Sequence, residues 1–515
     1  MVVFAPMPSA SDRMATVAKS GLRRRPRKAS RRSPVIVVMA GWTERVTVWV
    51  ARGVTYNRRH LMPVTRRELL CGLAAATAAS VLPGSALAQS APPPRIDPAR
   101  LRQHLEALSV FGRPAGGTFA DGVSRVGYSD ADVAGRTYAM ELMREAGLDP
   151  RIDAAGNIFG TRDGSERGLK PILFGSHIDS VPSGGNFDGD LGSLSAIEVV
   201  RTLKERGVVT RHPLQVVIWQ NEEGGLVGSH AAVGDVLDLE RQFNGIRLGD
   251  GLRKIGGNPD RLAEARMAPG SFHCYLELHI EQGGNLDRAG IPIGVVEGIV
   301  SIDEYDVEIA GFANHAGTTP MPERHNALLA AAKLIDAVQQ IVTREPGRQV
   351  GTVGRLAVFP NAPNVVPGMV KHSIELRDLS ADKIARLGQV VETQAQQIAR
   401  DTGTKITITK VEHDPPALAS PEVQSRIEQA AARLGLKTMR LPSGAGHDAQ
   451  MMAKLGPMGM IFVPSVGGIS HSPKELTHWP DCANGANVLL QTVLLMDTSQ
   501  LLNTRDPAAR PTVSE

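Results

Sequence analysis

Cysteine is scarce in this 515-residue chain, which contains only three. Two of them, Cys274 and Cys482, lie beyond residue 88, and no C-x-x-C spacing occurs. A disulfide framework, a four-cysteine zinc site and a dithiol redox centre are therefore excluded, although a single Cys274–Cys482 bridge stays open. Beyond residue 88 no apolar run reaches the roughly 18 residues that a membrane helix needs. The composition is that of a globular protein with two or three domains.

Positive charge is less informative than its total suggests. The formal net charge is +4, but the first 88 residues contain 15 of the 57 Lys and Arg residues and only three acidic ones. The remaining chain carries 42 basic and 50 acidic residues, a net charge of −8. Since it has no basic stripe with interleaved aromatic residues, no nucleic-acid partner is expected.

The basic N-terminal region contains a candidate export signal. Arg66-Arg67 precedes a moderately apolar run, and Ala86-Leu87-Ala88 has the small-x-small pattern of a signal-peptidase site. Residues 62–88 thus resemble a twin-arginine signal cleaved after Ala88, which predicts a periplasmic protein that is not held at the membrane after export. A buried first helix is the alternative. Because Met62 stands just ahead of the arginine pair, residues 1–61 are interpreted as an over-extended, non-structural N-terminus.

From residue 97 onward the hydrophobic pattern alternates between strands and helices. This alternation predicts an α/β fold with a mostly parallel sheet, in which ligands bind beyond the carboxyl ends of the strands. The first predicted strands are 170–175 and 214–220, with helices at 131–145 and 191–206. The rhythm resumes after Pro415 with a helix at 421–434 and a strand at 460–464. We therefore predict one domain from 97–299 and 415–502, followed by a disordered tail at 503–515.

The hydrophobic pattern changes over residues 300–414, where it predicts the order strand, helix, two strands, helix, strand. This order predicts a small ferredoxin-like α+β domain inserted into the larger one. The predicted elements are 302–309, 327–343, 351–358, 368–378, 383–401 and 405–411.

Histidine and carboxylate residues cluster after the first predicted strand. His177 follows it, and Asp188 lies in the glycine-rich loop Asn186-Phe187-Asp188-Gly189-Asp190. Histidine suits a divalent metal, and a loop carboxylate can give one oxygen to each of two ions about 4 Å apart. Asp179 is placed to accept the proton of the second ring nitrogen of His177. Taken alone, His177 could equally be a hydrogen-bonded core histidine.

Two adjacent carboxylates, Glu222 and Glu223, follow the next apolar run. Like charges side by side repel unless a cation lies between them. Neighbouring side chains at a strand end point in different directions, so one can bind an ion while the other takes a proton from water and returns it to a leaving amine. A solvated acidic pair is the alternative. With His279 and His471, which stand in similar segments, the sequence offers five ligands for two metal ions.

Eight segments occur in a fixed order, namely GSHIDSV, FDGDLG, NEEG, LELHIEQG, ANHAGTTPM, FPNAPNVVPG, SGAGHDA and SHSPKE. In this order they resemble the hydantoinase/carbamoylase group of amidohydrolases, which belongs to the aminoacylase and carboxypeptidase-like di-zinc superfamily. The group includes N-carbamoyl-L-amino acid hydrolases, β-ureidopropionases and allantoate amidohydrolases. The resemblance implies that one ion is bound by His177 and His279 and the other by Glu223 and His471, with Asp188 bridging them and Glu222 as general acid/base.

The resemblance also implies substrate contacts and a homodimer. His315 would stabilise the oxyanion, often from the neighbouring subunit, and such chemistry does need an electrophilic donor. Asn364 and Arg377 match the positions that hold the substrate carboxylate, for which a guanidinium is well shaped. Gln282 and His447 resemble further substrate contacts. The alternatives are a loop histidine for His315 and a lid ion pair for Arg377.

Two segments depart from the group pattern. Glu223-Gly224-Gly225-Leu226-Val227 replaces E-G-S-R-F, and Arg324-His325-Asn326-Ala327 replaces R-x-D-A. Neither departure changes a predicted ligand. Both put the identity of the substrate in doubt, because one lies near the base and the other opens a lid helix.

Together these features predict hydrolysis of a linear C–N amide or ureido bond in a small carboxylate substrate. The first choice is an N-carbamoyl-L-amino acid, which yields the amino acid, CO2 and ammonia. Allantoate and N-acyl amino acids or small peptides are the alternative substrates, and a metal-free binding protein is disfavoured by the intact ligand set. Zn²⁺ is the first choice for both ions, although the same ligands accept Mn²⁺ or Co²⁺.

Overall fold

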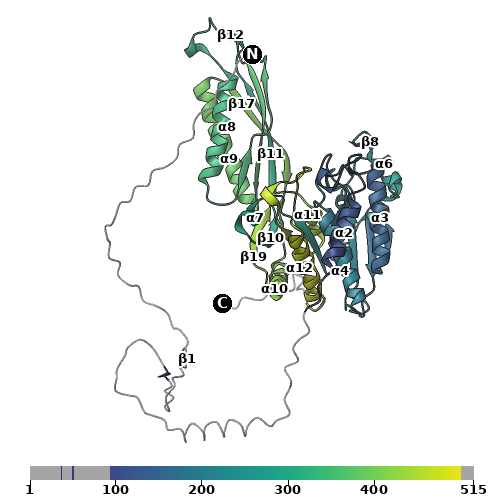
Figure 1. Cartoon of the computed structure of the whole chain (residues 1–515). Coiled ribbons are helices and arrows are strands. Elements are labelled where there is room, and N and C mark those ends of the chain that lie inside the picture. Colours follow the sequence, from purple (N-terminus) through teal and green to yellow (C-terminus); the bar gives the residue numbers. More distant parts are fainter. Residues whose placement is uncertain (1–35, 38–48, 51–92, 500–515) are drawn as a thin grey trace, which may run out of the picture. The chain divides into compact units, whose positions relative to one another are not determined.

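The computed structural model describes residues 36–37, 49–50 and 93–499 (Figure 1). The chain divides into the units Met1–Ser90 and Ala91–Glu515. In the first unit, strands β1 (Ile36–Val37) and β2 (Trp49–Val50) pair antiparallel. The predicted export signal at 62–88, most of residues 1–61 and the predicted tail at 503–515 lie outside the described residues. All that follows concerns the second unit.

A nine-stranded sheet forms the centre of this unit. Its centre consists of four parallel strands, whose order is β20 (Met458–Val463), β9 (Cys274–Ile280), β5 (Ile172–His177) and β6 (Leu214–Trp219). Every residue of these strands is buried except Gln215, which is half-buried. Such continuous apolar runs are typical of a parallel sheet covered on both faces.

The edges of the sheet are antiparallel. Beyond β6 lie β4 (Ile158–Arg162) and β3 (Asp149–Ile152), and beyond β20 lies β10 (Ile293–Ile299), which also pairs with β18 (Ala417–Leu418) and in parallel with β19 (Thr438–Ser443). Among the described residues no helix is long and apolar enough to cross a membrane. The predicted α/β class with a mostly parallel sheet is confirmed.

Alternate residues of the central strands enter two different hydrophobic cores, because successive side chains point to opposite faces. Ile172 and Phe174 of β5 belong to one core, whereas Leu173 belongs to the other. The first core is completed by α2 (Pro98–Leu108), α3 (Asp130–Ala146), α4 (Asp190–Glu205), α10 (Pro421–Arg433) and α12 (Trp479–Asp497). The second is completed by α5 (Val227–Val233), α7 (Asn285–Ala289) and α11 (Asp448–Leu455).

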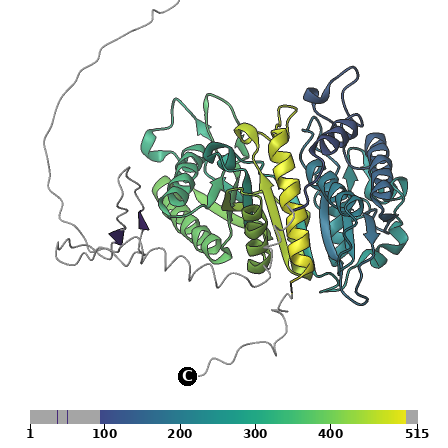
Figure 2. The same cartoon turned by 60° about the horizontal axis from the view of Figure 1, so that its bottom comes forward.

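The C-terminal segment completes the fold of the N-terminal one. Figure 2 shows α12 in yellow beside the blue and teal elements of the sheet, and α12 packs against α4. Leu101 and Val493, nearly 400 positions apart, belong to the same core. The smaller elements of this body are β7 (Gln242–Phe243), β8 (Ile246–Arg247), α6 (Leu248–Lys254), and the 3-10 helices η1 (Phe119–Asp121), η2 (Pro259–Ala265) and η4 (Val466–Gly468), whereas η3 (Met321–Glu323) lies within residues 300–414.

Residues 300–414, called the lid below, form a five-stranded antiparallel sheet with two helices on one face. The strand order is β13 (Val350–Thr352), β16 (Met369–Asp378), β11 (Ser301–Ala310) and β17 (Lys405–Asp414), and β14 (Leu356–Phe359) also pairs with β16. Helices α8 (Ala327–Arg344) and α9 (Ala381–Thr402) enclose a separate core drawn from residues 305–398. The predicted domain limits at 300 and 414 stay a prediction, but the cores separate within them.

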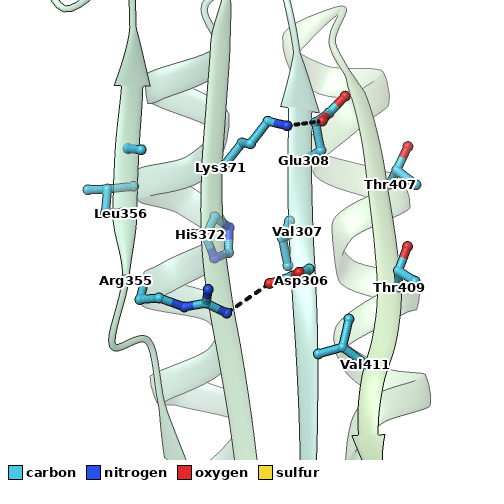
Figure 3. Close-up of a pocket in the computed structure, with 11 residues that line it drawn as sticks. Asp306, Val307, Glu308, Arg355, Leu356, Lys371, His372, Thr407, Thr409 and Val411 are labelled. Carbon is cyan, nitrogen blue, oxygen red and sulfur yellow. Dashed lines mark hydrogen bonds and ion pairs between the residues drawn. The ribbon is translucent and has the colours of Figure 1, made fainter. Parts of the chain in front are cut away.

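The other face of this lid sheet is open. Figure 3 looks onto it and shows Lys371 paired with Glu308 and Arg355 paired with Asp306, both at 2.9 Å, beside a shallow cavity of about 570 Å³. The strand predicted at 351–358 is in fact β13 and β14. Between the partner pairs Thr352–Glu375 and Leu356–His372 one side has an extra residue, so a bulge interrupts the strand.

Other boundaries follow from local chemistry. Strand β5 begins after Pro171, later than predicted, because proline has no N–H to donate to a ladder. The strand ends on His177 itself, two residues later than predicted. Asn326, one of the departures from the group pattern, accepts the N–H groups of Leu328 and Leu329 at 3.0 and 3.1 Å. Asparagine caps a helix as well as aspartate does, so this departure preserves the start of α8. Cys274 and Cys482 are both free, so the disulfide left open by the sequence does not form.

Arg125 joins three parts of the large domain from a fully buried position. Its guanidinium donates to the two carboxylate oxygens of Asp190 at 2.6 and 2.5 Å and to the carbonyls of Ile178, Leu108 and Phe111. Asp190 is the first residue of α4, and Ile178 follows β5. The ion pair thus fixes the segment that begins at His177 against the start of the helix.

We predict that Arg125→Met lowers the free energy of unfolding by about 3–5 kcal/mol, because it leaves the Asp190 carboxylate buried without its partner. Urea unfolding of the chelator-treated proteins would measure this loss. The double variant Arg125→Met/Asp190→Asn is expected to regain part of it, since no uncompensated charge remains. A single variant as stable as the wild type would contradict this account of the pair.

Candidate two-metal active site

The predicted ligands His177, Asp188 and His279 lie together at the carboxyl ends of neighbouring strands. His177 ends β5, His279 lies one residue before the end of β9, and Asp188 lies in the loop that leads into α4. The Nε2 atoms of His279 and His177 lie 3.0 and 3.7 Å from Asp188 Oδ1. One potential ligand atom from each of the three lies within 4.8 Å of the others.

A second group shares Asp188 with the first. It consists of Asp188, Glu223 and His471, again with ligand atoms within 4.8 Å of one another. The Nε2 atom of His471 lies 3.4 Å from Asp188 Oδ2 and 3.4 Å from Glu223 Oε2. Asp188 therefore presents one oxygen to each group, which is how a carboxylate bridges two metal ions.

Backbone carbonyls orient the two buried imidazoles. Nδ1 of His177 lies 3.0 Å from the carbonyl oxygen of Asp179, and Nδ1 of His279 lies 2.9 Å from that of Ile280. With the proton on Nδ1, each Nε2 keeps its lone pair for a ligand. The sequence predicted this role for the Asp179 carboxylate, but its Oδ1 lies 3.7 Å from the ring nitrogen. That carboxylate instead accepts the N–H groups of Glu222 and Glu223 at 3.1 and 3.2 Å.

These residues fit divalent cations. Among the described residues, Nε2 of His177, Nε2 of His279 and Oε1 of Glu223 are buried and have no hydrogen-bond partner. A buried polar atom left unpaired costs about 1–3 kcal/mol, whereas one cation in each group would satisfy these lone pairs. Burial and the nearby Asp188 raise the pKa of Glu223 to about 8, a penalty that a bound cation removes. Zinc, manganese and cobalt all accept this set of nitrogen and oxygen donors.

Glu222 lies beside the two groups rather than within them. Its side chain is about nine-tenths buried, and Oε2 lies 3.8 Å from Nε2 of His177. Burial first, and then the carboxylates of Asp448 and Glu223, hold its pKa well above the ordinary value. The two adjacent glutamates thus diverge as expected, with Glu223 directed to His471 and Glu222 near His177.

The backbone turn before the two glutamates needs two glycines. Asn221 has a positive φ of 50°, and its side chain lies between Gly127 and Gly224. A Cβ atom at Gly127 would lie 2.3 Å from Asn221 Oδ1, and one at Gly224 would lie 2.2 Å from Nδ2. Any larger side chain at either glycine would push Asn221, and with it Glu222, out of place.

Gln282 and His447, predicted as substrate contacts, lie against the ligand groups. The Gln282 side-chain amide donates to Asp188 Oδ2 at 2.8 Å. His447 is 1% exposed, its ring meets that of His279 edge-on at a centroid distance of 4.5 Å, and its Nε2 lies 2.8 Å from Ser443 Oγ. Both side chains therefore support ligand residues, and their contact with substrate stays a prediction.

His315 and Asn364 lie side by side in the lid. His315 belongs to β12 (Asn314–His315), which pairs with β15 (Val365–Val366), and the N–H of Ala316 donates to the Asn364 carbonyl at 2.9 Å. Both side chains are exposed. Within one chain this pair remains in the lid, where His315 lies on the segment after β11 and Asn364 on the segment just before β16.

Arg377 lies near the opposite end of β16. It follows Met369 by eight residues, which at about 3.3 Å per residue corresponds to about 26 Å along the strand. Arg377 Nε and Nη2 donate to the Glu375 carboxylate at 2.8 and 3.0 Å, and Nη1 donates to the Gly444 carbonyl at 2.6 Å. One chain therefore does not bring Asn364 and Arg377 together, although the sequence predicted that they act as a pair.

Glu475 is the residue near the ligands that sequence reasoning missed. It appears only as the last letter of the SHSPKE segment, yet its carboxylate accepts the N–H groups of Phe187 and Asp188. A glutamate four residues after a predicted ligand was the available signal. Without knowledge of the loop that it reaches, that signal could not be interpreted.

Comparison with known proteins places this site in a family. The pattern of peptidase family M20/M25/M40 matches residues 173–495, more than half of the chain. The chain belongs to this family. A member of similar sequence is an N-carbamoyl-L-amino acid amidohydrolase of Geobacillus stearothermophilus, 41% identical over 403 residues, which cover 76% of this chain and 97% of that protein. A ureidoglycolate hydrolase of Arabidopsis thaliana is 35% identical over 414 residues, which cover 77% and 86%.

Solved structures of family members agree with this placement. A hydantoinase/carbamoylase family amidase from Burkholderia multivorans has 34% identity and a TM-score of 0.73, and the match covers 79% of this chain and 99% of that one. The predicted resemblance is confirmed, and the M20-family chain is a hydrolase of carbon–nitrogen bonds. Enzymes of this family use divalent metals, which agrees with the two ligand groups around Asp188.

Proposed function

We propose that this M20-family chain hydrolyses N-carbamoyl-L-amino acids to the amino acid, CO2 and ammonia. The observation that carries the proposal is the pair of ligand groups that share Asp188 beside the buried Glu222. The similarity to the Geobacillus stearothermophilus N-carbamoyl-L-amino acid amidohydrolase over 97% of its length supports the choice of substrate. Ureidoglycolate hydrolases are also similar, so a ureido acid of that kind is the second candidate.

Glu222 performs the proton transfers in this proposal. Two divalent ions, Zn²⁺ as first choice, would polarise the substrate carbonyl and make water more acidic. Glu222 takes the proton of the attacking water and returns it to the leaving nitrogen, a task favoured by a carboxyl whose pKa burial has raised. Asp179 holds the amides of Glu222 and Glu223, and Gln282 holds Asp188, so the acid and the ligands keep their separate positions.

Arg377 binds the substrate carboxylate in this proposal. Three of its five N–H groups are bonded to Glu375 and Gly444. One N–H therefore remains on each terminal nitrogen, and two parallel donors of this kind suit a carboxylate. The Gly444 contact also joins the lid sheet to the loop that carries His447, which packs on His279.

The proposed enzyme is a homodimer in which His315 and Asn364 act on the partner's site. About 26 Å of strand β16 separates their end of the lid from Arg377. Large apolar side chains are exposed around that same end, and contiguous exposed apolar surface is typical of an interface. They are Phe312, Met321, Leu328, Leu329, Phe359 and Met369, with exposed fractions from 36% to 72%. A second copy would cover them and deliver His315 to stabilise the oxyanion.

The periplasmic location is part of the same proposal and rests on residues 62–88. We expect the exported protein to begin at Gln89, directly after the predicted cleavage site Ala88. N-terminal sequencing of protein from the periplasmic fraction would measure this. An N-terminus upstream of Met62, or a protein retained in the cytoplasm, would contradict the export prediction without affecting the metal site.

The proposed substrate and base are tested by ammonia release. The mature protein with Zn²⁺ is expected to release ammonia from N-carbamoyl-L-amino acids faster than from allantoate or ureidoglycolate. Hydrolysis of N-acetyl-amino acids, which yields acetate and no ammonia, would be followed by release of the free amino acid and is expected to be much slower. Glu222→Gln should lower kcat by about 10²–10⁴-fold, the range of general acid–base catalysis, while both ions stay bound.

A matched control is Glu166→Gln, which neutralises an exposed glutamate paired with Arg211 and should keep full activity. Glu222→Gln with wild-type kcat would refute the role of the base. Faster hydrolysis of ureidoglycolate or allantoate than of every N-carbamoyl-L-amino acid would move the substrate to the second candidate.

The shared site is tested by mixing two inactive variants. If His315 acts on the partner's site, a heterodimer of Glu222→Gln and His315→Ala subunits contains one intact site. Refolding an equal mixture should then restore about a quarter of the wild-type activity, since half of random dimers are mixed and one of their two sites is intact. Sedimentation would check that dimers form. Recovery of no activity from mixed dimers would show that each chain uses its own His315.

A further inference from the structure

Glu475 connects two loops that lie far apart in the sequence. Its side chain is buried, with 6% exposed, in the segment between β20 and α12. Oε1 accepts the N–H groups of Phe187 and Asp188 at 3.0 and 3.1 Å, and Oε2 accepts the hydroxyl of Ser470 at 2.9 Å. One carboxylate thus holds the backbone of the Asp188 loop and the residue that precedes His471.

Ser470 extends this link to the shared ligand. Its Oγ also lies 3.0 Å from Asp188 Oδ2, the same oxygen that lies 3.4 Å from His471 Nε2. The hydroxyl has one proton, so at any moment it donates to only one of the two carboxylates, that of Glu475 or that of Asp188. One side of the second ligand group is therefore enclosed by a ring of contacts that joins Glu475, Ser470, His471 and Asp188.

Glycine at position 185 allows this approach. A Cβ atom there would lie 2.0 Å from Glu475 Oε1, so any other residue would collide with the carboxylate. Gly184 forms an isolated bridge with Val123, but Asp188 lies in no strand. The N–H groups of Leu191 and Asp190 at the start of α4 hold the carbonyls of Phe187 and Asp188. Glu475 holds the N–H groups of the same two residues.

The geometry points to Glu475 as a positioning residue for the ion that Asp188, Glu223 and His471 would hold. By fixing the Asp188 backbone and Ser470 together, it sets the separation between the shared carboxylate and His471. The effect should be larger at this ion than at the other, because two of the three ligands of the other group, His177 and His279, are held by strands β5 and β9. This inference rests on the two-metal site of the proposed function.

The test is the Zn²⁺ affinity of the mature protein, measured by competition with a chromophoric chelator. Loss of a residue that orients metal ligands typically costs 10–100-fold in affinity, and we expect Glu475→Ala to weaken one of two bound ions by about that factor. Glu475→Gln should bind nearly as the wild type, because the amide oxygen can accept both N–H groups while its NH2 donates to Ser470.

Glu198→Ala is the matched control. Glu198 is also buried, with 2% exposed, and lies in α4 eight residues beyond its first residue, Asp190. It accepts the amide of Asp97, the guanidinium of Arg100 and the hydroxyl of Thr202, none of which is a predicted ligand. Both Zn²⁺ affinities should survive its loss, even if the protein becomes less stable. If Glu475→Ala does not fold, Ser470→Ala decides, since it keeps the two amide bonds to Glu475 and removes the contacts of the Ser470 hydroxyl with the carboxylates of Glu475 and Asp188.

The outcomes separate this inference from the proposed function. A wild-type protein that binds fewer than two Zn²⁺ ions would refute the two-metal site itself. A wild type that binds two ions, with a folded Glu475→Ala variant of unchanged affinities, would overturn the role of Glu475 alone. Equal loss of an ion in Glu198→Ala would do the same, because the effect would then be general destabilisation. Unchanged affinities in Ser470→Ala, where only that variant folds, would also overturn it.

Discussion

The carboxylate of Asp188 is the point on which the site depends. Three imidazole nitrogens lie within 3.7 Å of its oxygens, and each oxygen belongs to a different ligand group. Displacement of this carboxylate would affect the group with Glu223 and His471 most, because His177 and His279 of the other group are held by strands. The surrounding structure is arranged to hold it: Glu475 bonds its backbone, and Gln282 and Ser470 contact its side chain.

Holding these groups in the interior is electrostatically unfavourable by itself. Glu222, Glu223 and Asp179 are buried acids, and burial raises the pKa of each. Backbone amides offset part of this cost at Asp179, and divalent cations are the natural partners for the rest. The same low-dielectric surroundings favour a carboxyl that can hold and release a proton, which is the property required of Glu222.

The lid places the remaining groups at its two ends. Arg377 contacts the large domain through Gly444, whereas His315 and Asn364 lie beyond the start of the same strand. A ten-residue strand is longer than any amino-acid-sized substrate, so one chain in this arrangement does not bring all three residues to one substrate, whereas the proposed second copy would. The exposed apolar side chains near His315 suit that arrangement.

Much of this could be read from the sequence, because local chemistry and periodicity determine it. Buried apolar runs predict the central strands, and ligands after such runs must meet, since parallel strands end at the same edge. His177, Asp188 and Glu223 were predictable on that ground. His279 and His471 were predictable in the same way, and the eight ordered segments added the assignment of each ligand to one of the two ions.

Only the tertiary structure decided which groups hold the ligands and which residues act together. The Asp179 carboxylate bonds two amides 43 and 44 positions away, and Glu475 bonds amides nearly 290 positions away. Asn364 and Arg377, 13 positions apart, are separated by the length of β16. Sequence patterns carry information about near neighbours and strand ends, whereas hydrogen bonds between distant loops depend on how the whole sheet and its connections are folded.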